Sequence, residues 1–595
     1  MAESVRPSAT LDIVALTISL IGFLGLITVI LQLKSGIVRI DRLVFLAFLA
    51  MTCAPFATAL VKTPKLPFLF PPVVAIFLLY PIAAPHGVVY STDPIFNFSF
   101  TNSVVASGFW APGTGNAFAH GYSFYPLGNV FVGYVILTAG LPSIVAMLWV
   151  QPILRLLAVP AIAFAIGRRL FGTRVASLGL FFYLGTASIL FNLPVQQGMG
   201  VIFVGLSLLS LLILTQSPDR GAQRRAQVLF ALVAGGLVMT HHLSSYIFAG
   251  WLTALAVLMA KSRFRPSVSP VRLGVLVIYF LGLLSLYIFF FTYSIFLTHE
   301  GTLQGVVGNL IAPEGFPAGP NPGLGRTFSP FEVAWLGGSV FLLLILALVS
   351  IYRYRRSRRH PFAVANGLVA SFLVFVTLPL IATTLNYVPL RISEYANLFI
   401  TPFAATTLIR WTRPAENPLA RIAPRFSHER RWFSPTVVVL VALAIFMGGN
   451  LAPLTMRMYF EEPLSRTTDS PLNLGAEGIR AADWAREHLR HGRLWGDQLA
   501  VDVFSGFANL EVDFGSLQIF ENPTLNASAW VRLHVGDYVA VDRWMVLLRP
   551  NFFQQPSRTA PLAAADVEKF AFDPHFALVY EDETFSIYRV MSKPP

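Results

Sequence analysis

Long apolar runs recur along most of the chain and are separated by short polar or basic turns. Apolar runs of about 20 residues are long enough to cross a bilayer as helices, and their spacing here predicts about thirteen crossings. The predicted spans are residues 11–33, 42–61, 66–85, 149–168, 174–193, 198–215, 227–241, 245–260, 273–297, 331–352, 363–384, 392–410 and 434–452. The pattern therefore predicts a polytopic α-helical membrane protein.

The pattern changes to that of a soluble domain after about residue 455. Residues 475–491 have the spacing of an amphipathic helix. Its expected buried side consists of Ile479, Trp484 and Leu489.

Two short runs near the end of the chain, residues 578–580 and 585–590, have the composition of strands and predict a terminal hairpin. We therefore expect two domains. Residues 1–454 would form a transmembrane domain, and residues 455–595 a small extracytoplasmic α/β domain of about 140 residues.

The composition agrees with a membrane protein. The 595 residues are 55% hydrophobic and only 12% charged, and the mean hydropathy is +0.64. The net charge of +13 does not indicate a nucleic-acid partner, because the basic residues lie in short turns between the spans. The single cysteine, Cys53, lies in an apolar span, which excludes a disulfide framework and a cysteine-based metal site.

The basic residues also predict the orientation. They gather in turns that lie two predicted spans apart, so all these turns can face one side, and cytoplasmic loops are enriched in Lys and Arg. The turns contain Arg168, Arg169 and Arg174; Arg220, Arg224 and Arg225; Lys261, Arg263, Arg265 and Arg272; Arg353, Arg355, Arg356, Arg358 and Arg359; and the stretch from Arg410 to Arg431. We expect an integral protein of the cell membrane with its N-terminus in the cytoplasm and its C-terminal domain outside.

An external loop is predicted at residues 86–128, and it is polar and glycine-rich from residue 90 onward. Long irregular loops are often functional. Asp93 lies about where the chain leaves the bilayer, and a carboxylate there is costly unless it has a partner or a task. The alternative is a helix cap or a loop carboxylate in water.

This loop faces outward only if one crossing separates it from Arg168. The apolar stretch 129–147 is interrupted by Gly133, Gly140 and Pro142. We therefore expect part of it to lie along the outer interface as a short helix. If this stretch crossed the membrane as well, Asp93 would be cytoplasmic.

Further polar residues stand at predicted span ends on the same face and predict a polar pocket. They are Gln196, Gln197, His241, His242, Glu300, Arg391 and Glu394. A carboxylate such as Asp93 can act as a base, and the guanidinium of Arg391 suits a phosphate because it can form two parallel hydrogen bonds. The simpler alternatives are interfacial hydrogen-bonding groups for the histidines and a span anchor for Arg391. The proline- and glycine-rich loop 298–330, which contains Glu300, is a candidate lid.

A family resemblance appears in the predicted external loop. The strings DPIFN from Asp93, TNSVVASGFW from Thr101 and YSFYPLG ending at Gly128 resemble the first external loop of the catalytic subunit of oligosaccharyltransferase. More broadly, they are similar to the GT-C superfamily of integral-membrane glycosyltransferases. The resemblance implies that Asp93 is the catalytic or metal-binding acid, with Mg or Mn as the divalent metal, and it adds Tyr125 to the substrate-binding candidates.

The resemblance extends to other spans and also has departures. It implies that Arg391, which with Pro402 matches an arginine opening a late span, faces the lipid pyrophosphate, and that Glu300 takes the place of a glutamate in the fifth external loop. An acidic D-x-E motif of the family is replaced here by Gln196 and Gln197. The WWDYG signature of the family's sequon-binding domain is absent after residue 455, so recognition of a peptide acceptor is not implied.

These observations predict a glycosyltransferase that uses a lipid-linked sugar donor. It would move a sugar from a polyprenyl phosphate or pyrophosphate carrier to a protein, glycan or lipid acceptor at the outer face, with the inversion that the resemblance implies. Asp93 and Glu300 are the predicted catalytic residues. The alternatives are a transporter or flippase for a lipid-linked or anionic solute, which would use the same polar groups as a binding site, and a non-catalytic relative of the GT-C enzymes.

Overall fold

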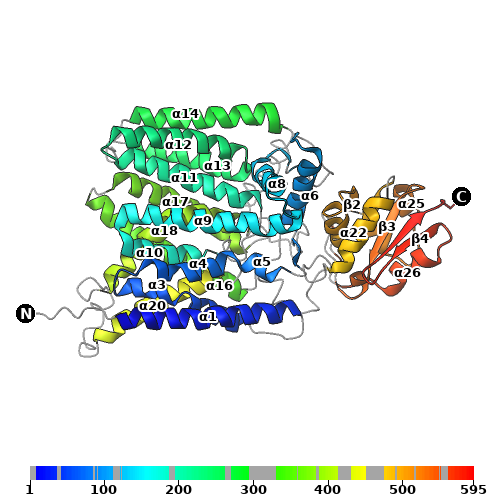
Figure 1. The fold of residues 1–595 in the computed structure, drawn as a ribbon, viewed down its shortest axis with the longest axis horizontal. Helices are drawn as coiled ribbons and strands as arrows, with labels where there is room; N and C mark the ends of the chain where they lie inside the picture. The colour runs from blue at the N-terminus through cyan, green and yellow to red at the C-terminus, as the bar shows by residue number, and fades with distance from the viewer. Residues whose placement is uncertain are drawn as a thin grey trace, which may run out of the picture.

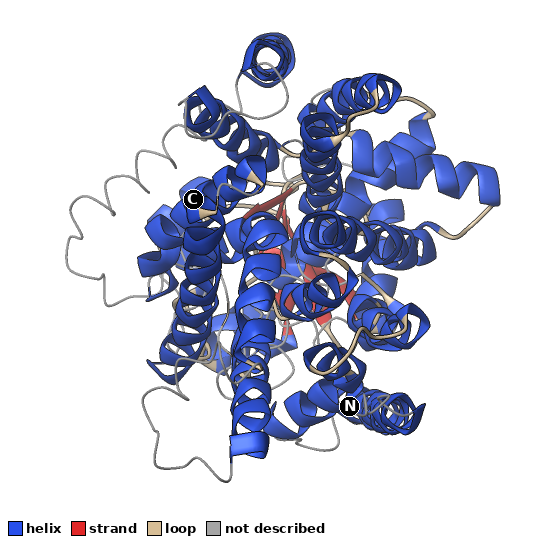
Figure 2. Ribbon diagram, turned by 90° about the vertical axis from the view of Figure 1, so that its left-hand side faces the viewer, coloured by secondary structure: helices blue, strands red, loops and turns tan. Residues whose placement is uncertain are grey.

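The computed structural model describes residues 9–35, 42–84, 87–89, 92–111, 121, 123–186, 195–260, 270–293, 330–357, 360–382, 387–412, 430–450, 475–489, 492–514, 517–548, 550, 552 and 560–594. Long helices lie side by side in one bundle, and a small sheet lies beyond one end of it (Figure 1). Viewed along the bundle, the strands lie behind its centre (Figure 2).

The bundle is built almost entirely from α-helices. In chain order they are α1 (Ala9–Ser35), α2 (Arg42–Thr52), α3 (Ala54–Ala57), α4 (Phe70–Phe77), α5 (Leu79–Ala83), α6 (Thr92–Ser107), α8 (Leu127–Ala139), α9 (Ser143–Phe171), α10 (Thr173–Leu184), α11 (Gln196–Gln216), α12 (Arg220–Val238), α13 (His242–Ala260), α14 (Pro270–Tyr287), α16 (Pro330–Arg356), α17 (Pro361–Thr377), α18 (Tyr387–Trp411) and α20 (Arg430–Asn450). Short 3₁₀ or π turns extend several of them, at η1 (Thr58–Leu60), η2 (Leu66–Leu69), η5 (Ile288–Thr292) and η6 (Leu378–Ala382).

The polytopic helical fold predicted from the hydrophobic pattern is confirmed. Among the described residues, seven helices are long and apolar enough to cross a membrane, or up to eight if α2 and the bent segment after it form one span. Every predicted span contains a helix, but several fall short of that standard, so the expected count of about thirteen is too high by this measure. Some helices, such as α10, are too short, and the apolar stretch of α18 is interrupted by polar residues such as Glu394 and Asn397.

Described residues beside three of the basic turns predicted to be cytoplasmic lie together at one end of the bundle. The rings of Phe171 and Tyr354 lie 5.1 Å apart, which places the end of α9 beside the end of α16. The guanidinium of Arg410, near the end of α18, lies 5.7 Å from the Tyr354 ring. The C-terminal sheet lies beyond the opposite end (Figure 1).

The prediction of an irregular loop over residues 86–128 is wrong for α6, which is a regular helix of 16 residues. Its polar side chains misled the prediction because they are satisfied inside the helix. The hydroxyl of Thr101 donates to the Asn97 carbonyl at 2.8 Å, and that of Ser103 donates to the Ser99 carbonyl at 3.1 Å. Such bonds to the preceding turn let short polar residues occupy a buried helix.

Helix α8 has the short length expected for this stretch, and its position at the membrane interface stays a prediction. Its 13 residues span about 20 Å, less than the roughly 30 Å of a hydrocarbon core. In Figure 1, α6 and α8 lie across the direction of the bundle helices, at the end next to the sheet. The predicted break occurs at Gly140, whose φ of 64° closes α8. Gly133 does not interrupt the helix, since it lies within α8 and packs against Val104 and Val105.

The C-terminal region contains a mixed sheet in the order β2-β1-β3-β5-β4. Strands β1 (Leu494–Gly496), β2 (Val512–Phe514) and β3 (Tyr538–Asp542) are parallel, whereas β4 (Phe576–Glu581) and β5 (Phe585–Val590) pair antiparallel. The predicted hairpin is therefore confirmed. The accompanying helical segments are α22 (Ala476–His488), α23 (Gln498–Ala500), η11 (Val501–Ser505), α24 (Leu517–Phe520), α25 (Ala527–Arg532), η12 (Arg543–Val546) and α26 (Ala564–Phe572). The predicted domain boundary near residue 455 lies outside the described residues and stays a prediction.

Helix α22 confirms the amphipathic helix but corrects its buried side. Leu489 is buried as expected, whereas Ile479 and Trp484 are only half-buried. The deepest positions are small residues, Ala481, Ala482 and Ala485.

The sheet region packs directly on α6. The Ser99 hydroxyl donates to the Ser505 carbonyl at 3.1 Å, and the rings of Phe98 and Phe507 lie 5.3 Å apart. Gly506 lies so close to Ile95 that no side chain would fit between them. The helix that begins beside Asp93 is thus held between the bundle and the sheet.

Two buried carboxylates meet at the edge where β1 and β3 end. Asp497 follows β1 and accepts from the Ala500 N–H, while Asp542 ends β3 and accepts from the N–H groups of Trp544 and Met545. Both side chains are fully buried. Burial, together with the neighbouring Asp497 carboxylate, raises the pKa of Asp542 well above its ordinary value.

The carboxylate pair predicts a pH-dependent stability. Because the pKa of Asp542 is raised in the folded state, its stabilising contribution is complete below the unfolded pKa of about 3.9 and is lost as the pH rises through the folded pKa. Asp542→Asn removes one of the two buried negative charges. We expect this variant to melt at a higher temperature than the parent at pH 8 and to show a flatter pH dependence. Thermal unfolding in detergent between pH 5 and pH 8.5 measures both.

The matched control is Asp483→Asn, which changes an exposed carboxylate paired with Arg486. It should leave the pH profile unchanged. A profile for Asp542→Asn that follows the parent at every pH would contradict the raised pKa of Asp542.

Candidate active site

Two residues predicted separately to carry the chemistry, Asp93 and Arg391, lie together. Asp93 is in the first turn of α6 and Arg391 is near the start of α18, and their Oδ2 and Nη2 atoms are 3.6 Å apart. The side chains are 43% and 34% exposed, respectively. An ion pair this open to water contributes less than about 1 kcal/mol, so a competing anion can displace one partner.

A second ion pair lies one helical turn further along α18. Glu394 accepts a hydrogen bond from the guanidinium of Arg155, which comes from the middle of α9, and both side chains are almost fully buried. The Gln197 amide donates to the other carboxylate oxygen of Glu394 at 3.1 Å. A charge inside a helical bundle needs such compensation, because an unpaired one would be costly to bury.

The start of α11 makes room for this buried pair. A Cβ atom on Gly198 would lie 2.7 Å from Cδ of Arg155. Any larger residue would therefore push the guanidinium away from Glu394. Gly200 likewise lies too close to Ser244 for a side chain. The string QQGMG thus allows α9 and α13 to approach α11 closely.

The remaining described candidates join the same network from its other side. The Gln196 amide donates to the Tyr125 carbonyl at 2.8 Å, and the rings of Tyr125 and His242 lie 5.1 Å apart. The Leu127 N–H donates to the Met239 carbonyl at 3.2 Å, which ties the start of α8 to the end of α12.

His241 connects to α18 through a hydroxyl. Its Nδ1 lies 2.7 Å from the Ser244 oxygen, which in turn lies 2.6 Å from the Tyr395 hydroxyl. Tyr395 follows Glu394 directly. His241, His242, Gln196, Gln197, Tyr125 and Glu394 therefore form one connected set, although several of them are buried rather than facing water at a span end.

Two predicted features cannot be placed. Glu300 and the candidate lid at residues 298–330 lie outside the described residues. Their roles in catalysis and closure stay predictions.

The described residues do not form a metal site of their own. They contain no group of three His, Cys, Asp or Glu side chains that could hold an ion together. The Asp93 carboxylate also lies against the Arg391 guanidinium, where a cation would bind. The Mg or Mn ion implied by the resemblance therefore stays a prediction, and no step below depends on it.

Arg155 is the main residue of this network that the sequence analysis missed. It lies within the predicted span 149–168, and an ionisable residue inside a span is itself a functional signal. Ser244 and Tyr395 carried no comparable signal, since hydroxyl side chains are common in apolar helices.

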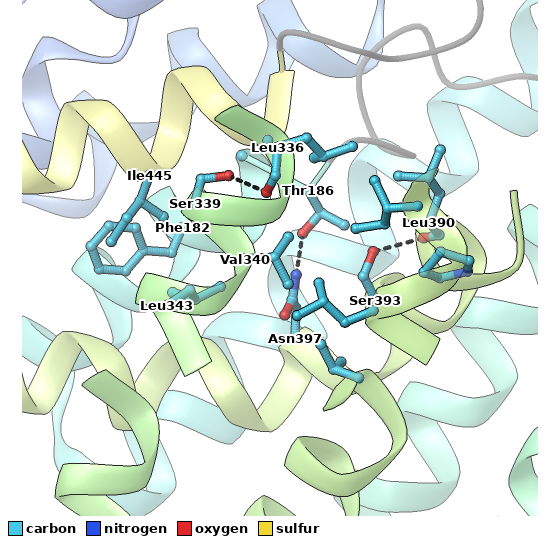
Figure 3. Close-up of a pocket in the computed structure, with 16 residues that line it drawn as sticks. Phe182, Thr186, Leu336, Ser339, Val340, Leu343, Leu390, Ser393, Asn397 and Ile445 are labelled. Atoms are coloured by element: carbon cyan, nitrogen blue, oxygen red, sulfur yellow. Dashed lines mark hydrogen bonds between the residues drawn. The ribbon is translucent and has the colours of Figure 1, made fainter. Parts of the chain in front are cut away.

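An apolar crevice lies between α10, α16, α17, α18 and α20 (Figure 3). Leu390 and Pro389, which precede Arg391, are part of its lining. Its polar atoms are few and mostly satisfied, as in the 2.8 Å hydrogen bond from the Asn397 amide to the Thr186 hydroxyl. With a volume of about 30 Å³ the crevice is narrow.

No protein-family model and no curated protein sequence matches the chain. Solved structures with a similar chain path include ArnT from Cupriavidus metallidurans bound to undecaprenyl phosphate, at 14% identity and a TM-score of 0.47, covering 87% of this chain and 96% of that one. The apo state of ArnT from the same organism is 14% identical with a TM-score of 0.45, and the match covers 87% of this chain and 96% of that one. The arabinofuranosyltransferase AftD from Mycobacteria gives 12% identity and a TM-score of 0.49, covering 88% of this chain and 41% of that one.

At these identities and TM-scores, the likeness assigns neither a substrate nor an active-site residue to this chain. The resemblance to oligosaccharyltransferase in particular stays a prediction. The fold and the site define the class of protein: a polytopic helical membrane protein with a polar site at the end of its bundle next to a small mixed sheet.

The buried pair predicts strongly coupled mutational effects. Arg155→Met should leave Glu394 buried without its cation and destabilise the protein by about 3–5 kcal/mol, and Glu394→Leu should act similarly. The double variant Arg155→Met/Glu394→Leu should recover most of the loss, because no uncompensated charge remains. Equilibrium unfolding in detergent measures the cycle.

The exposed pair Arg480 and Glu477, 3.3 Å apart, offers a matched control. The corresponding cycle there should change stability by less than about 1 kcal/mol in every variant. If the Arg155/Glu394 double variant lost as much as the two single variants combined, the coupling would be refuted.

Proposed function

We propose that the protein is a membrane glycosyltransferase that moves a sugar from a polyprenyl phosphate or pyrophosphate carrier to an acceptor at the outer face of the membrane. The observation that carries the proposal is the exposed pair of Asp93 and Arg391 above the buried network. It combines a carboxylate and a phosphate-binding cation within 4 Å at one end of the bundle.

Arg391 is suited to the carrier phosphate. A phosphate carries more charge than a carboxylate and accepts two parallel hydrogen bonds from a guanidinium. Because the exposed pair with Asp93 is weak, the phosphate would take over Arg391 and release the Asp93 carboxylate. Donor binding would thereby make the base available.

The transfer step follows from this exchange. The Asp93 carboxylate accepts the proton of an acceptor hydroxyl, whose oxygen forms a bond to the anomeric carbon of the sugar. The bond from that carbon to the phosphate oxygen breaks, and Arg391 stabilises the negative charge that develops on the leaving phosphate. Attack from the face opposite the leaving group would invert the anomeric carbon, as the family resemblance implies.

The surroundings of the pair support these roles. The pair of Glu394 and Arg155 fixes the turn of α18 that carries Arg391. The acceptor, which is a protein, glycan or lipid, would approach Asp93 from the exposed side.

The proposal requires the Asp93 end of the bundle to be extracytoplasmic. The gathering of basic turns at the opposite end supports this orientation. In a Cys53→Ala background, a single cysteine at Ser357 should be protected from an impermeant thiol reagent in intact cells, and one at Ala476 should react. In inside-out vesicles the pattern should reverse, so that the cysteine at Ser357 reacts and the one at Ala476 is protected. Labelling of the Ser357 position from outside would overturn the orientation.

The function is tested directly at the exposed pair. Asp93→Asn keeps the shape of the side chain and removes its charge, so transfer from a panel of radiolabelled polyprenyl-linked sugars should fall by roughly 10²–10⁴-fold. Arg391→Lys keeps the charge but loses the planar fork, so it should raise the KM for the donor. Both proteins should melt close to the parent, because both side chains are partly in water.

Asp219→Asn is the matched control. Asp219 also pairs with an arginine, Arg225, but lies at the start of α12, at the opposite end of the bundle. Its substitution should leave transfer unchanged. Transfer at the parental rate by Asp93→Asn would refute the assignment of the base.

One observation favours the second candidate, a transporter or flippase. The pair of Arg155 and Glu394 lies inside the bundle, and intramembrane charge pairs often mark solute pathways. A protein that moves a lipid-linked sugar across liposome membranes, but transfers no sugar to any acceptor, would establish that function in place of the transferase.

A further inference from the structure

Gln151 is a buried polar residue that the proposed reaction does not use. It lies on α9, one helical turn before Arg155, and its side chain is fully buried. Neither its amide nitrogen nor its amide oxygen has a hydrogen-bond partner among the described residues. Burying an amide without partners costs free energy, so an apolar side chain of similar size would be more stable at this position.

The Gln151 amide lies behind the turn that starts α8. A Cβ atom on Gly128 would be 3.9 Å from its nitrogen and 3.4 Å from Cγ of Met199. Met199 follows Gln197 and Gly198 on α11, so the same short segment contacts Glu394, Arg155 and the surroundings of Gln151. The amide is thus next to the predicted site and not in a separate part of the bundle.

A second amide nearby is also incompletely satisfied. Asn129 follows Gly128 and is fully buried, and its oxygen has no partner among the described residues. Its nitrogen donates to the Asn97 oxygen at 3.0 Å, and the Asn97 nitrogen donates to the backbone carbonyl of Asp93 at 2.8 Å. A line of amides therefore runs from this place to the residue proposed as the base.

We propose that Gln151 and Asn129 form a subsite for hydroxyl groups of the sugar that the carrier delivers. This inference rests on the proposed function and names the part of the donor that these residues bind. Amide groups both donate and accept, as hydroxyl groups do, so they match a polyol better than an anion or an apolar chain. Arg155, one helical turn from Gln151 on α9, is bound to Glu394, so this charge is compensated and the subsite favours an uncharged sugar.

Met199 is the side chain that has to move for the sugar to enter. It is unbranched, and flexible methionine side chains adapt readily to a changing neighbour. Gly128 has no side chain to close the space between Met199 and Gln151. Movement of Met199 would therefore open the subsite without breaking a hydrogen bond of the protein.

The test uses Gln151→Met, which keeps the length of the side chain and removes the amide. Without ligand, this variant should melt at the same temperature as the parent or higher. Donor binding is measured as the rise in melting temperature caused by polyprenyl phosphate alone and by polyprenyl phosphate carrying glucose, mannose, galactose or arabinose. Both proteins also carry Asp93→Asn, so that no sugar is consumed during the measurement.

The parent should bind at least one of the sugar-bearing carriers more tightly than the bare carrier. Gln151→Met should lose about ten-fold in affinity for that carrier and bind bare polyprenyl phosphate as before. Gln216→Met, at the other end of α11, is the control and should change neither affinity. Because binding is the readout, this result stands or falls separately from the effect of Asp93→Asn on transfer.

Three outcomes would overturn the subsite. One is a ligand-free melting temperature well below that of the parent, which would show that the amide has a structural role. Another is an equal loss of affinity for the bare carrier. The third is a parent protein that no sugar stabilises beyond polyprenyl phosphate alone.

Discussion

The buried charge of Glu394 constrains the whole site. Its side chain is almost fully buried, so protein groups must compensate the carboxylate. Arg155 supplies the cation from α9, and the Gln197 amide supplies a donor from α11. The absence of a side chain at Gly198 lets the arginine approach. Three helices are therefore fixed relative to one another, and Arg391 is fixed one turn above them.

The two ion pairs on α18 differ in burial, and therefore in the free energy that is lost when each pair is broken. Breaking the buried pair leaves a charge that nothing else can solvate, at a cost of about 3–5 kcal/mol, so it behaves as a structural fixture. The exposed pair of Asp93 and Arg391 is worth less than about 1 kcal/mol, because water replaces either partner. The same helix thus carries a rigidly held ion pair at Glu394 and, three residues earlier, a cation at Arg391 whose partner another anion can replace. This combination is the one that the proposed binding and release of a charged donor would require.

The sequence predicted the helices better than it predicted their contacts. Whether a residue suits lipid or water depends on that residue alone. The apolar spans and the basic turns at every second connection could therefore be read directly from the sequence. Asp93 and Arg391 were both proposed, but only the packing of α6 on α8, α9 and η11 brings Asp93 to the start of α18. The helix α6 was missed because the hydroxyl and amide groups of residues such as Thr101 bond within it. The carboxylates of Asp497 and Asp542 meet only through the register of β1 and β3, which no local pattern reveals.

The two halves of the exposed pair are positioned by different parts of the protein. Arg391 is held from below by the buried pair in the bundle. Asp93 is held through α6, whose Asn97 bonds to α8 and whose Ser99 bonds to the sheet region at Ser505. A small shift of the sheet region against the bundle would therefore move Asp93 and leave Arg391 in place. The distance between Asp93 and Arg391 therefore depends on how the C-terminal region packs on α6, although the region contributes no residue of its own to the pair.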